Sequence, residues 1–251
     1  MKPQLIFISL ATLSIFLSTE GHVYAHMRDY LVNQPYYTTR KGEFEVELYN
    51  DLNLTDVRND ETYNSGHQVE LEYGITDHLQ LAYYELFKWG RLKDWQQDAF
   101  KIEGKYRFFE SGELPVDIAL YTEYKNPNGH QNIASDEIET KLILSRDLGP
   151  WNITANFTAE RQINRQENWQ LEYTAGVSYP IDPRIRLGLE LRETLGDSSK
   201  FGFGGKNREL QLVPGVYANI TPHMRVLFGP AIGLTRGTDD LQLKSIVEIE
   251  F

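Results

Sequence analysis

Apolar and charged residues alternate along almost the whole chain from Gly42 to its last residue. In residues 43–48 Glu alternates with Phe, Val and Leu, and residues 100–108 set Phe, Ile, Gly and Tyr against Lys, Glu and Arg. Successive side chains of a β-strand point to opposite faces of the sheet, so each run predicts a strand with one apolar and one charged face. The charged face is too costly to bury in an apolar core. The chain is therefore predicted to form β-strands whose charged faces contact water.

About twelve such runs follow one another, and the links between them are of two kinds. After every second run the link is tight, as at 76–78 and 180–183, whereas most other links are longer and polar, as at 54–66 and 196–207. Short turns at one end and long loops at the other are typical of membrane barrels, in which the short turns face the periplasm. We therefore predict an all-β fold, a transmembrane antiparallel up-and-down β-barrel of about 12 strands over residues 42–251. A soluble periplasmic or extracellular β-protein is the alternative.

Residues 241–251 repeat this alternation and stop on an aromatic residue. Leu243, Val247, Ile249 and Phe251 share one face of the expected strand. This pattern resembles the assembly signal of bacterial outer-membrane β-barrel proteins, whose last strand carries alternating apolar residues and ends in an aromatic residue, usually Phe. The resemblance implies that these four residues are recognised by the barrel-assembly machinery of a Gram-negative envelope. It also implies that the protein resides in outer-membrane lipid.

Residues 1–25 have the composition of a secretory signal peptide. Lys2 precedes an apolar run over residues 5–17, and small residues precede the cleavage site, which we place after Ala25. The run is too short for a spanning helix, which needs about 20 apolar residues; a buried N-terminal helix is the alternative. Residues 26–41 show no clear period. We predict that they form a periplasmic N-terminal segment leading into the barrel, with a plug or a small helix as alternatives.

Composition narrows the class of protein. The chain has no cysteine, so it has no disulfide framework. Its mean hydropathy is -0.47, which is compatible with a membrane barrel because each strand contributes only every second residue to the lipid face. The formal net charge is -11 at pH 7. Nucleic-acid binding calls for clustered Lys and Arg, so we expect no nucleic-acid partner.

A second resemblance lies in residues 67–85, which read HQVELEYGITDHLQLAYYE. Two alternating runs are joined there by the turn Tyr73, Gly74, Ile75, Thr76, Asp77. The stretch resembles a hairpin of outer-membrane transporters associated with aromatic meta-pathway degradation. Gly and Asp suit the geometry of a tight turn, so the shared motif is structural. The resemblance implies uptake or efflux of small molecules.

The charged faces of the strands are expected to line the inside of the barrel. Charges out of water are costly unless paired, so the lumen must be either a hydrated channel or a mesh of ion pairs. Barrels of eight strands are filled and barrels of sixteen or more enclose an aqueous channel, so about twelve strands allow both. The residues that we predict to line a solute or ion pathway lie at mid-strand on the charged face: Glu70, Glu72, Lys101, Glu103, Lys105, Arg107, Arg186, Glu190 and Arg192.

These features predict a porin-like outer-membrane channel or transporter. Small, polar or charged solutes would pass by diffusion, with the acidic groups of the lumen favouring cations. A second hypothesis is a non-conducting structural or adhesive barrel whose long loops bind a partner. A loop-borne enzyme is the third.

Catalytic and metal-binding patterns are weaker. An outer-membrane phospholipase also uses about twelve strands and places a His, a Ser and an Asn on its outer surface near the rim, and this chain offers Ser65 with His67 and His130 with Ser135. Neither pair has a carboxylate or amide at a spacing that forces contact with the His ring. The six histidines are not spaced as metal ligands. We therefore expect no enzyme, no cofactor and no metal site.

Overall fold

The computed structural model describes residues 29–57, 63–89, 95–127, 135–163, 167–200 and 208–251. The predicted signal peptide at residues 1–25, the first residues of the N-terminal segment and His130 lie outside the described residues. No helix of the described residues is long and apolar enough to cross a membrane.

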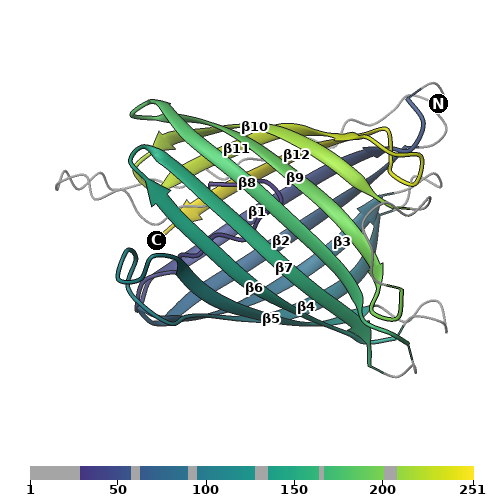
Figure 1. Cartoon of the computed structure of the whole chain (residues 1–251), viewed down its shortest axis with the longest axis horizontal. Coiled ribbons are helices and arrows are strands. Elements are labelled where there is room, and N and C mark those ends of the chain that lie inside the picture. The colour runs from purple at the N-terminus through teal and green to yellow at the C-terminus, as the bar shows by residue number, and fades with distance from the viewer. Residues whose placement is uncertain (1–28, 58–62, 90–94, 128–134, 164–166, 201–207) are drawn as a thin grey trace, which may run out of the picture.

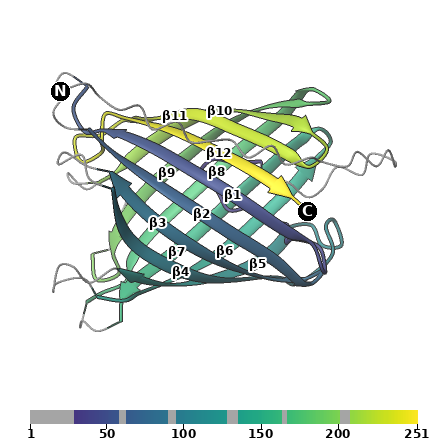
Figure 2. The same ribbon diagram turned by 180° about the vertical axis from the view of Figure 1, so that it is seen from behind.

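Twelve strands of the described residues form one closed barrel (Figures 1 and 2). They are β1 (Phe44–Leu54), β2 (Tyr63–Thr76), β3 (Leu79–Trp89), β4 (Trp95–Arg107), β5 (Asp117–Pro127), β6 (Glu137–Leu148), β7 (Trp151–Gln162), β8 (Gln170–Asp182), β9 (Ile185–Asp197), β10 (Leu210–Thr221), β11 (Met224–Gly233) and β12 (Leu241–Glu250). Each strand pairs in antiparallel register with the next, and β12 pairs with β1. The predicted fold class, an antiparallel up-and-down barrel of about 12 strands, is confirmed.

Strands β1 and β12 close the barrel, and the end of the chain takes part in that closure. The Phe251 amide donates to the Phe44 carbonyl oxygen at 2.8 Å, and the two rings lie 6.3 Å apart. Leu243, Val247 and Ile249 pair with Leu52, Leu48 and Val46 of β1. The residues of the predicted assembly signal thus lie on the closing strand. Their recognition by the assembly machinery stays a prediction.

The two ends of the barrel differ in their links. Four of the links at one end, 77–78, 149–150, 183–184 and 222–223, hold two residues each between the strands that they join. The fifth link there, 108–116, is longer. We call this the short-turn end; the C-terminal residue also lies there (Figure 1). The opposite end, which we call the long-link end, carries the links that start after β1, β3, β5, β7, β9 and β11.

The faces of the strands divide by polarity as the alternation predicts. Large apolar side chains that point outward and remain exposed include Leu71, Tyr73, Leu81, Ile102, Leu120, Phe157, Leu189, Val216 and Phe228. Charged side chains buried inside the barrel include Glu47, Glu70, Glu103, Lys105, Asp117, Glu190, Arg225 and Glu248. A barrel with an apolar outside and a polar inside is the arrangement that suits lipid around the wall. The candidate site is therefore the inside of the barrel.

Candidate functional site in the barrel lumen

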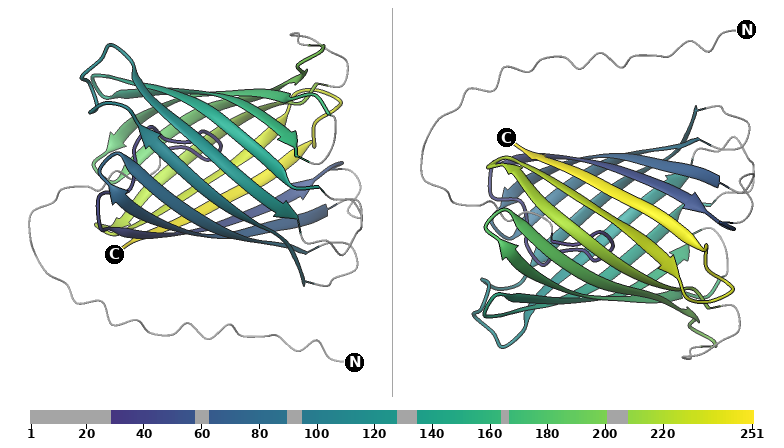
Figure 3. Two further views of the ribbon diagram at one scale, coloured as in Figure 1. Left: turned by 90° about the horizontal axis from the view of Figure 1, so that it is seen from below. Right: turned by 90° about the horizontal axis from the view of Figure 1, so that it is seen from above.

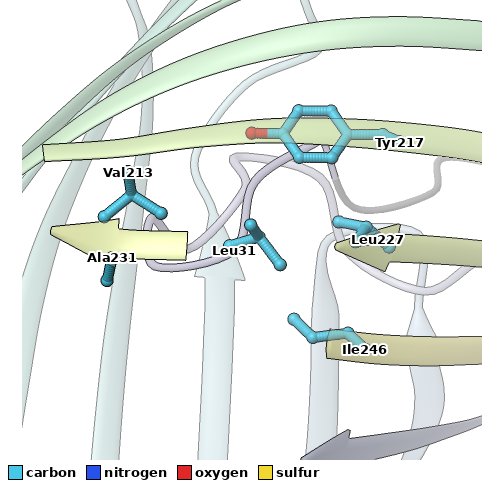
Figure 4. Packing of buried hydrophobic residues seen from close by; sticks show 6 residues of the cluster. All are labelled: Leu31, Val213, Tyr217, Leu227, Ala231 and Ile246. Carbon is cyan, nitrogen blue, oxygen red and sulfur yellow. The ribbon is translucent and has the colours of Figure 1, made fainter. Parts of the chain in front are cut away.

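The described part of the N-terminal segment, residues 29–41, runs inside the barrel in its short-turn half (Figure 3). Tyr30, Leu31 and Tyr36 are buried there. Leu31 packs in a cluster of inward-facing apolar residues (Figure 4), which consists of Val213, Tyr217, Leu227, Ala231 and Ile246. The segment packs in the manner of the plug that we considered as an alternative. Its assignment as a periplasmic unit ending at residue 41 stays a prediction.

The carboxylate of Glu190 is the main anchor of this segment. It accepts hydrogen bonds from the backbone N–H groups of Leu31, Val32 and Asn33 at 2.7, 2.9 and 2.8 Å. The Asn33 side-chain amide donates to it at 3.0 Å, and the Tyr217 hydroxyl at 3.1 Å. Three consecutive N–H groups converging on one anion form a concave anion site of the kind made by oriented backbone amides. The wall and the segment are therefore joined by charge-assisted hydrogen bonds, which are among the stronger ones in proteins.

A second ionic contact fixes the start of the segment. The Asp29 carboxylate lies 2.7 Å from an Arg225 nitrogen and 3.4 Å from Arg186 Nε. Further hydrogen bonds run from Tyr30 to Asn152, from the Gln34 amide to Asn156, and from Thr39 to Glu72 and Gln80. These partners belong to β2, β3, β7, β9 and β11, so the segment is attached to strands around the barrel.

Glycines of the wall make room for the segment at two close approaches. A Cβ at Gly74 would lie 1.9 Å from the Arg40 carbonyl oxygen, and Lys41 forms a parallel bridge with Gly74. A Cβ at Gly176 would lie 2.7 Å from the Tyr30 ring. Only glycine lets a backbone approach so closely. The inner wall is thus shaped to hold the segment.

The long-link half of the lumen is lined by five ion pairs, of which four join neighbouring strands and one lies within β6. Lys101 pairs with Glu123 at 3.1 Å, and Arg192 pairs with Glu172 at 2.8 Å. Similar pairs join Lys125 to Glu137, Lys141 to Glu139 and Lys244 to Asp51. We call these five pairs the ion-pair ladder. The Arg192 side chain keeps 39% of its surface exposed, so this half of the lumen admits water.

The wall formed by β12, β1 and β2 is acidic. Two groups of carboxylates share Glu47: one adds Glu45 and Glu248, and the other adds Glu70 and Glu72. The ligand oxygens within each group lie within 4.8 Å of one another, and the Tyr49 hydroxyl lies within hydrogen-bond distance of both Glu47 and Glu70. These groups have the donors that a hard cation prefers. The expectation of no metal site stays a prediction.

A small pocket lies between the segment and the wall. It is lined by Pro35, Tyr37, Thr39, Glu45, Glu47, Glu72, Gln80 and Lys105. The segment supplies the first three of these residues and the wall supplies the others. The acidic wall therefore faces a space that the segment does not fill.

The structure places the nine predicted pathway residues in two groups. Lys101 and Arg192 belong to the ion-pair ladder and are partly exposed to the lumen. The other seven lie in the short-turn half, where Glu190, Arg186, Glu72 and Arg107 bond to the segment and Glu70, Glu103 and Lys105 are buried in the wall. Residues 29–41 were not among the predicted pathway residues, because the pathway was predicted from the alternation and this segment has none.

Arg107 links the segment to the rim of the barrel. Its guanidinium donates to the Thr38 hydroxyl at 3.2 Å and to the Asp77 carbonyl oxygen at 2.7 Å, and it pairs with Glu110 at 2.7 Å. The hydrogen bond from Arg107 is the main cause that lowers the pKa of Glu110, which lies in the link after β4. Burial raises the pKa of the Tyr36 hydroxyl, which donates to the Phe109 carbonyl oxygen.

The lowered pKa of Glu110 predicts a small dependence of the free energy of unfolding on pH. Because the pKa is lower in the folded state, the stabilisation is present above the unfolded pKa and is lost as the pH falls through the folded value. The Glu110→Gln variant is therefore expected to be slightly less stable than the wild type at pH 7, with the difference disappearing in acid. Denaturant unfolding at both pH values measures this. A difference that grows in acid would contradict the assignment.

The fold and the lined lumen define a class, a closed antiparallel β-barrel of twelve strands with a polar interior. No family model and no curated protein sequence matches the chain. Solved structures match in fold. The KdgM porin in complex with disordered oligogalacturonate is 7% identical, with a TM-score of 0.57 and coverage of 82% of this chain and 98% of that chain. The NanC porin is 11% identical, with a TM-score of 0.55 and coverage of 83% and 98%. At these identities the likeness shows the fold alone.

Proposed function

We propose that the protein is an outer-membrane channel that passes small, polar or charged solutes by diffusion. The observation that carries the proposal is the ion-pair ladder, because its partly exposed charges line a lumen that admits water. A charged, hydrated lumen inside an apolar wall is the arrangement of a porin. A neighbour in fold was solved with oligogalacturonate, a finding that supports a polar solute.

The proposed pathway enters at the long-link end and runs along the ion-pair ladder. It then continues through the small pocket between the N-terminal segment and the acidic wall. Glu45, Glu47 and Glu72 line this pocket and would favour cations at the narrowest part of the path. Of the predicted pathway residues, Lys101 and Arg192 would act in the wide part. Lys105 and Glu72 would act in the narrow part.

The exposed apolar side chains on the outside of the barrel form what we call the outward apolar belt. This belt supports the proposal that the barrel lies in the outer membrane, surrounded by lipid. Cleavage of the signal peptide near Ala25 and recognition of Leu243, Val247, Ile249 and Phe251 by the assembly machinery belong to the same proposal. They would deliver the chain to that membrane.

Current through single molecules in a planar bilayer tests the proposal. The protein is refolded, its folding is checked by heat-modifiable electrophoretic mobility, and a salt gradient is applied. Small unitary steps with a preference for cations are expected. Silence from both the wild type and a Glu190→Gln variant, with both proteins folded and inserted, would overturn the channel.

The same measurement addresses a second candidate, a non-conducting structural barrel. The observation that favours it is the N-terminal segment, which is attached across the short-turn half of the lumen. A sealed barrel would stay silent even after the segment is released. Its function would then lie in the outer loops.

Ion selectivity is expected to depend on the basic members of the ion-pair ladder. Replacing Lys101 and Arg192 together by glutamine removes two positive charges from the exposed part of the lumen, while Glu123 and Glu172 remain. The reversal potential in a salt gradient should therefore shift further toward that of a cation-selective pore. Arg184→Gln, in the exposed turn between β8 and β9, is the matched control and should leave it unchanged. An unchanged reversal potential in the double variant would show that neither residue lines the pathway.

A further inference from the structure

Three polar side chains meet on the outward face of the first hairpin. The Ser65 hydroxyl lies 2.9 Å from His67 Nε2, and His67 Nδ1 lies 2.9 Å from the Asn50 side-chain oxygen Oδ1. An amide oxygen can only accept a hydrogen bond, so this contact places the ring proton on Nδ1. The free Nε2 can then accept the proton of Ser65. Nucleophile, base and orienting group stand in the order that activates a serine.

The register of β1 and β2 brings these residues together. Asn50 is the direct cross-strand partner of His67, and Ser65 lies two residues before His67 on the same face of β2. Their neighbours on that face include Leu48, which is exposed on the outside of the barrel. The three residues therefore lie on the outward wall and not in the lumen. The link between the two strands hides this pairing from sequence spacing.

The surroundings of the triad are those of a membrane interface. Ser65 lies two residues inside the start of β2, close to the long-link end. The Trp95 ring lies 4.8 Å from the His67 ring, and the Tyr63 and Trp89 rings lie 5.8 Å apart beside Ser65. Tyr and Trp gather where lipid meets water. Asn50 is exposed and Ser65 keeps 8% of its surface exposed, so the triad borders the surrounding phase.

We propose that Ser65, His67 and Asn50 form a hydrolytic triad that cleaves carboxylic esters of lipids at the outer surface of the membrane. Ser65 Oγ attacks the ester carbonyl carbon while His67 Nε2 takes the hydroxyl proton. The bond from the carbonyl carbon to the alcohol oxygen then breaks, the leaving oxygen takes the proton from His67, and the acyl group stays on Ser65. Water attacks this acyl ester with His67 again as base, which releases the fatty acid and restores the Ser65 hydroxyl. Asn50 holds the ring in the required tautomer throughout.

The position of the triad selects the substrate class. An ester can reach Ser65 only from outside the barrel, beside the apolar belt and the aromatic rings. A long acyl chain can lie along that belt while the ester group stays at the level of the rings. Short soluble esters lack this contact. The proposed activity uses no lumen residue and is independent of conduction.

Hydrolysis by the refolded whole protein tests the proposal. The substrates are p-nitrophenyl palmitate in mixed micelles, p-nitrophenyl acetate in solution, and phosphatidylcholine vesicles assayed for released fatty acid. We expect hydrolysis of the palmitate ester and of the vesicles, and covalent labelling of Ser65 by a fluorophosphonate located by mass spectrometry. Ser65→Ala and His67→Ala should each lower the rate by about 100-fold or more. The matched control is Ser199→Ala, since Ser199 bonds to Asp197 and not to a histidine.

Asn50 provides a test of its positioning role. Asn50→Ala should lower the rate and the fluorophosphonate labelling together, whereas Asn50→Asp, which keeps an oxygen acceptor for His67 Nδ1, should restore both. Absence of hydrolysis and of labelling in protein shown to be folded would overturn the triad, as would a rate unchanged in Ser65→Ala. Cleavage of the acetate ester alone would overturn the assignment to lipid esters.

Discussion

Single-channel conductance is expected to rise several-fold when Glu190 is replaced by glutamine. Glutamine keeps one acceptor oxygen and turns an NH₂ group toward the backbone N–H groups that the carboxylate now holds. Hydrogen bonds to a charged group contribute about 1.5 to 3 kcal/mol each. Losing two of them weakens the attachment of the segment by about 3 kcal/mol or more, which shifts the ratio of attached to released segment by about 100-fold. Planar-bilayer recording measures the effect.

Two comparisons make this result specific to the N-terminal segment. Glu139→Gln removes a carboxylate from the ion-pair ladder, where Glu139 pairs with Lys141 and lies away from the segment's anchors, so its conductance should stay near the wild-type value. Asp29→Asn removes the contacts to Arg186 and Arg225 and should raise conductance in the same direction as Glu190→Gln. Equal conductance in all four proteins, each folded and inserted, would show that the segment does not limit the current.

The barrel itself could be predicted from the sequence because its determinants are local. In each strand the alternation of apolar and charged residues predicts which face points out of the barrel and which points into the lumen, as Leu71 and Tyr73 against Glu70 and Glu72 illustrate. The tight links carry turn residues such as Gly149, which adopts a positive φ of 61°. Strand number and the two kinds of end follow from counting these signals along the chain.

The place of the N-terminal segment depends instead on residues far along the chain. Leu31 bonds to Glu190 across 159 positions, and Tyr30 bonds to Asn152 across 122. The segment has no period, and its N–H groups acquire their acceptors only after the barrel has closed. In the sequence, nothing distinguishes Glu190 from the other charged residues on the inward faces of the strands. Its role as an anchor is visible only in three dimensions. The segment that it holds lies in the short-turn half of the lumen, where seven of the nine predicted pathway residues also lie.

The contact between Asn50 and His67 is a third case. It follows from the register of the two strands, but the spacing of the two residues in the sequence does not reveal it. Ser65 was predicted to lie in the link 54–66, whereas β2 begins at Tyr63, so Ser65 and His67 share one face of this strand by the period of two. The amide that orients His67 comes from the neighbouring strand, 17 positions earlier. Pairing the apolar faces of residues 44–54 with those of residues 63–73 places Asn50 opposite His67. Predicting the triad therefore required the register of β1 and β2, which motif spacing does not give.

The outward belt leads to the second large effect, because it distinguishes a membrane barrel from a soluble one. Leu189 lies mid-strand on β9 with 46% of its surface exposed. In lipid, Arg at the midplane of a barrel wall destabilises by about 2 to 4 kcal/mol, and by about 0 to 1 kcal/mol near the interface. Leu189→Arg should therefore lower the free energy of unfolding by that larger amount. Ile181→Arg, close to the short-turn end of β8, should have little effect.

Guanidinium unfolding of the barrel in phospholipid vesicles measures both variants against the wild type. In a soluble β-protein both positions would be exposed to water, and exposed substitutions usually change stability by no more than about 0.5 kcal/mol. The two environments therefore give different patterns: a depth-dependent loss in lipid, and two small, similar changes in water. If both variants unfold with nearly the free energy of the wild type, the outer face does not contact lipid. A charge that leaves the free energy of unfolding unchanged at mid-strand cannot be facing hydrocarbon.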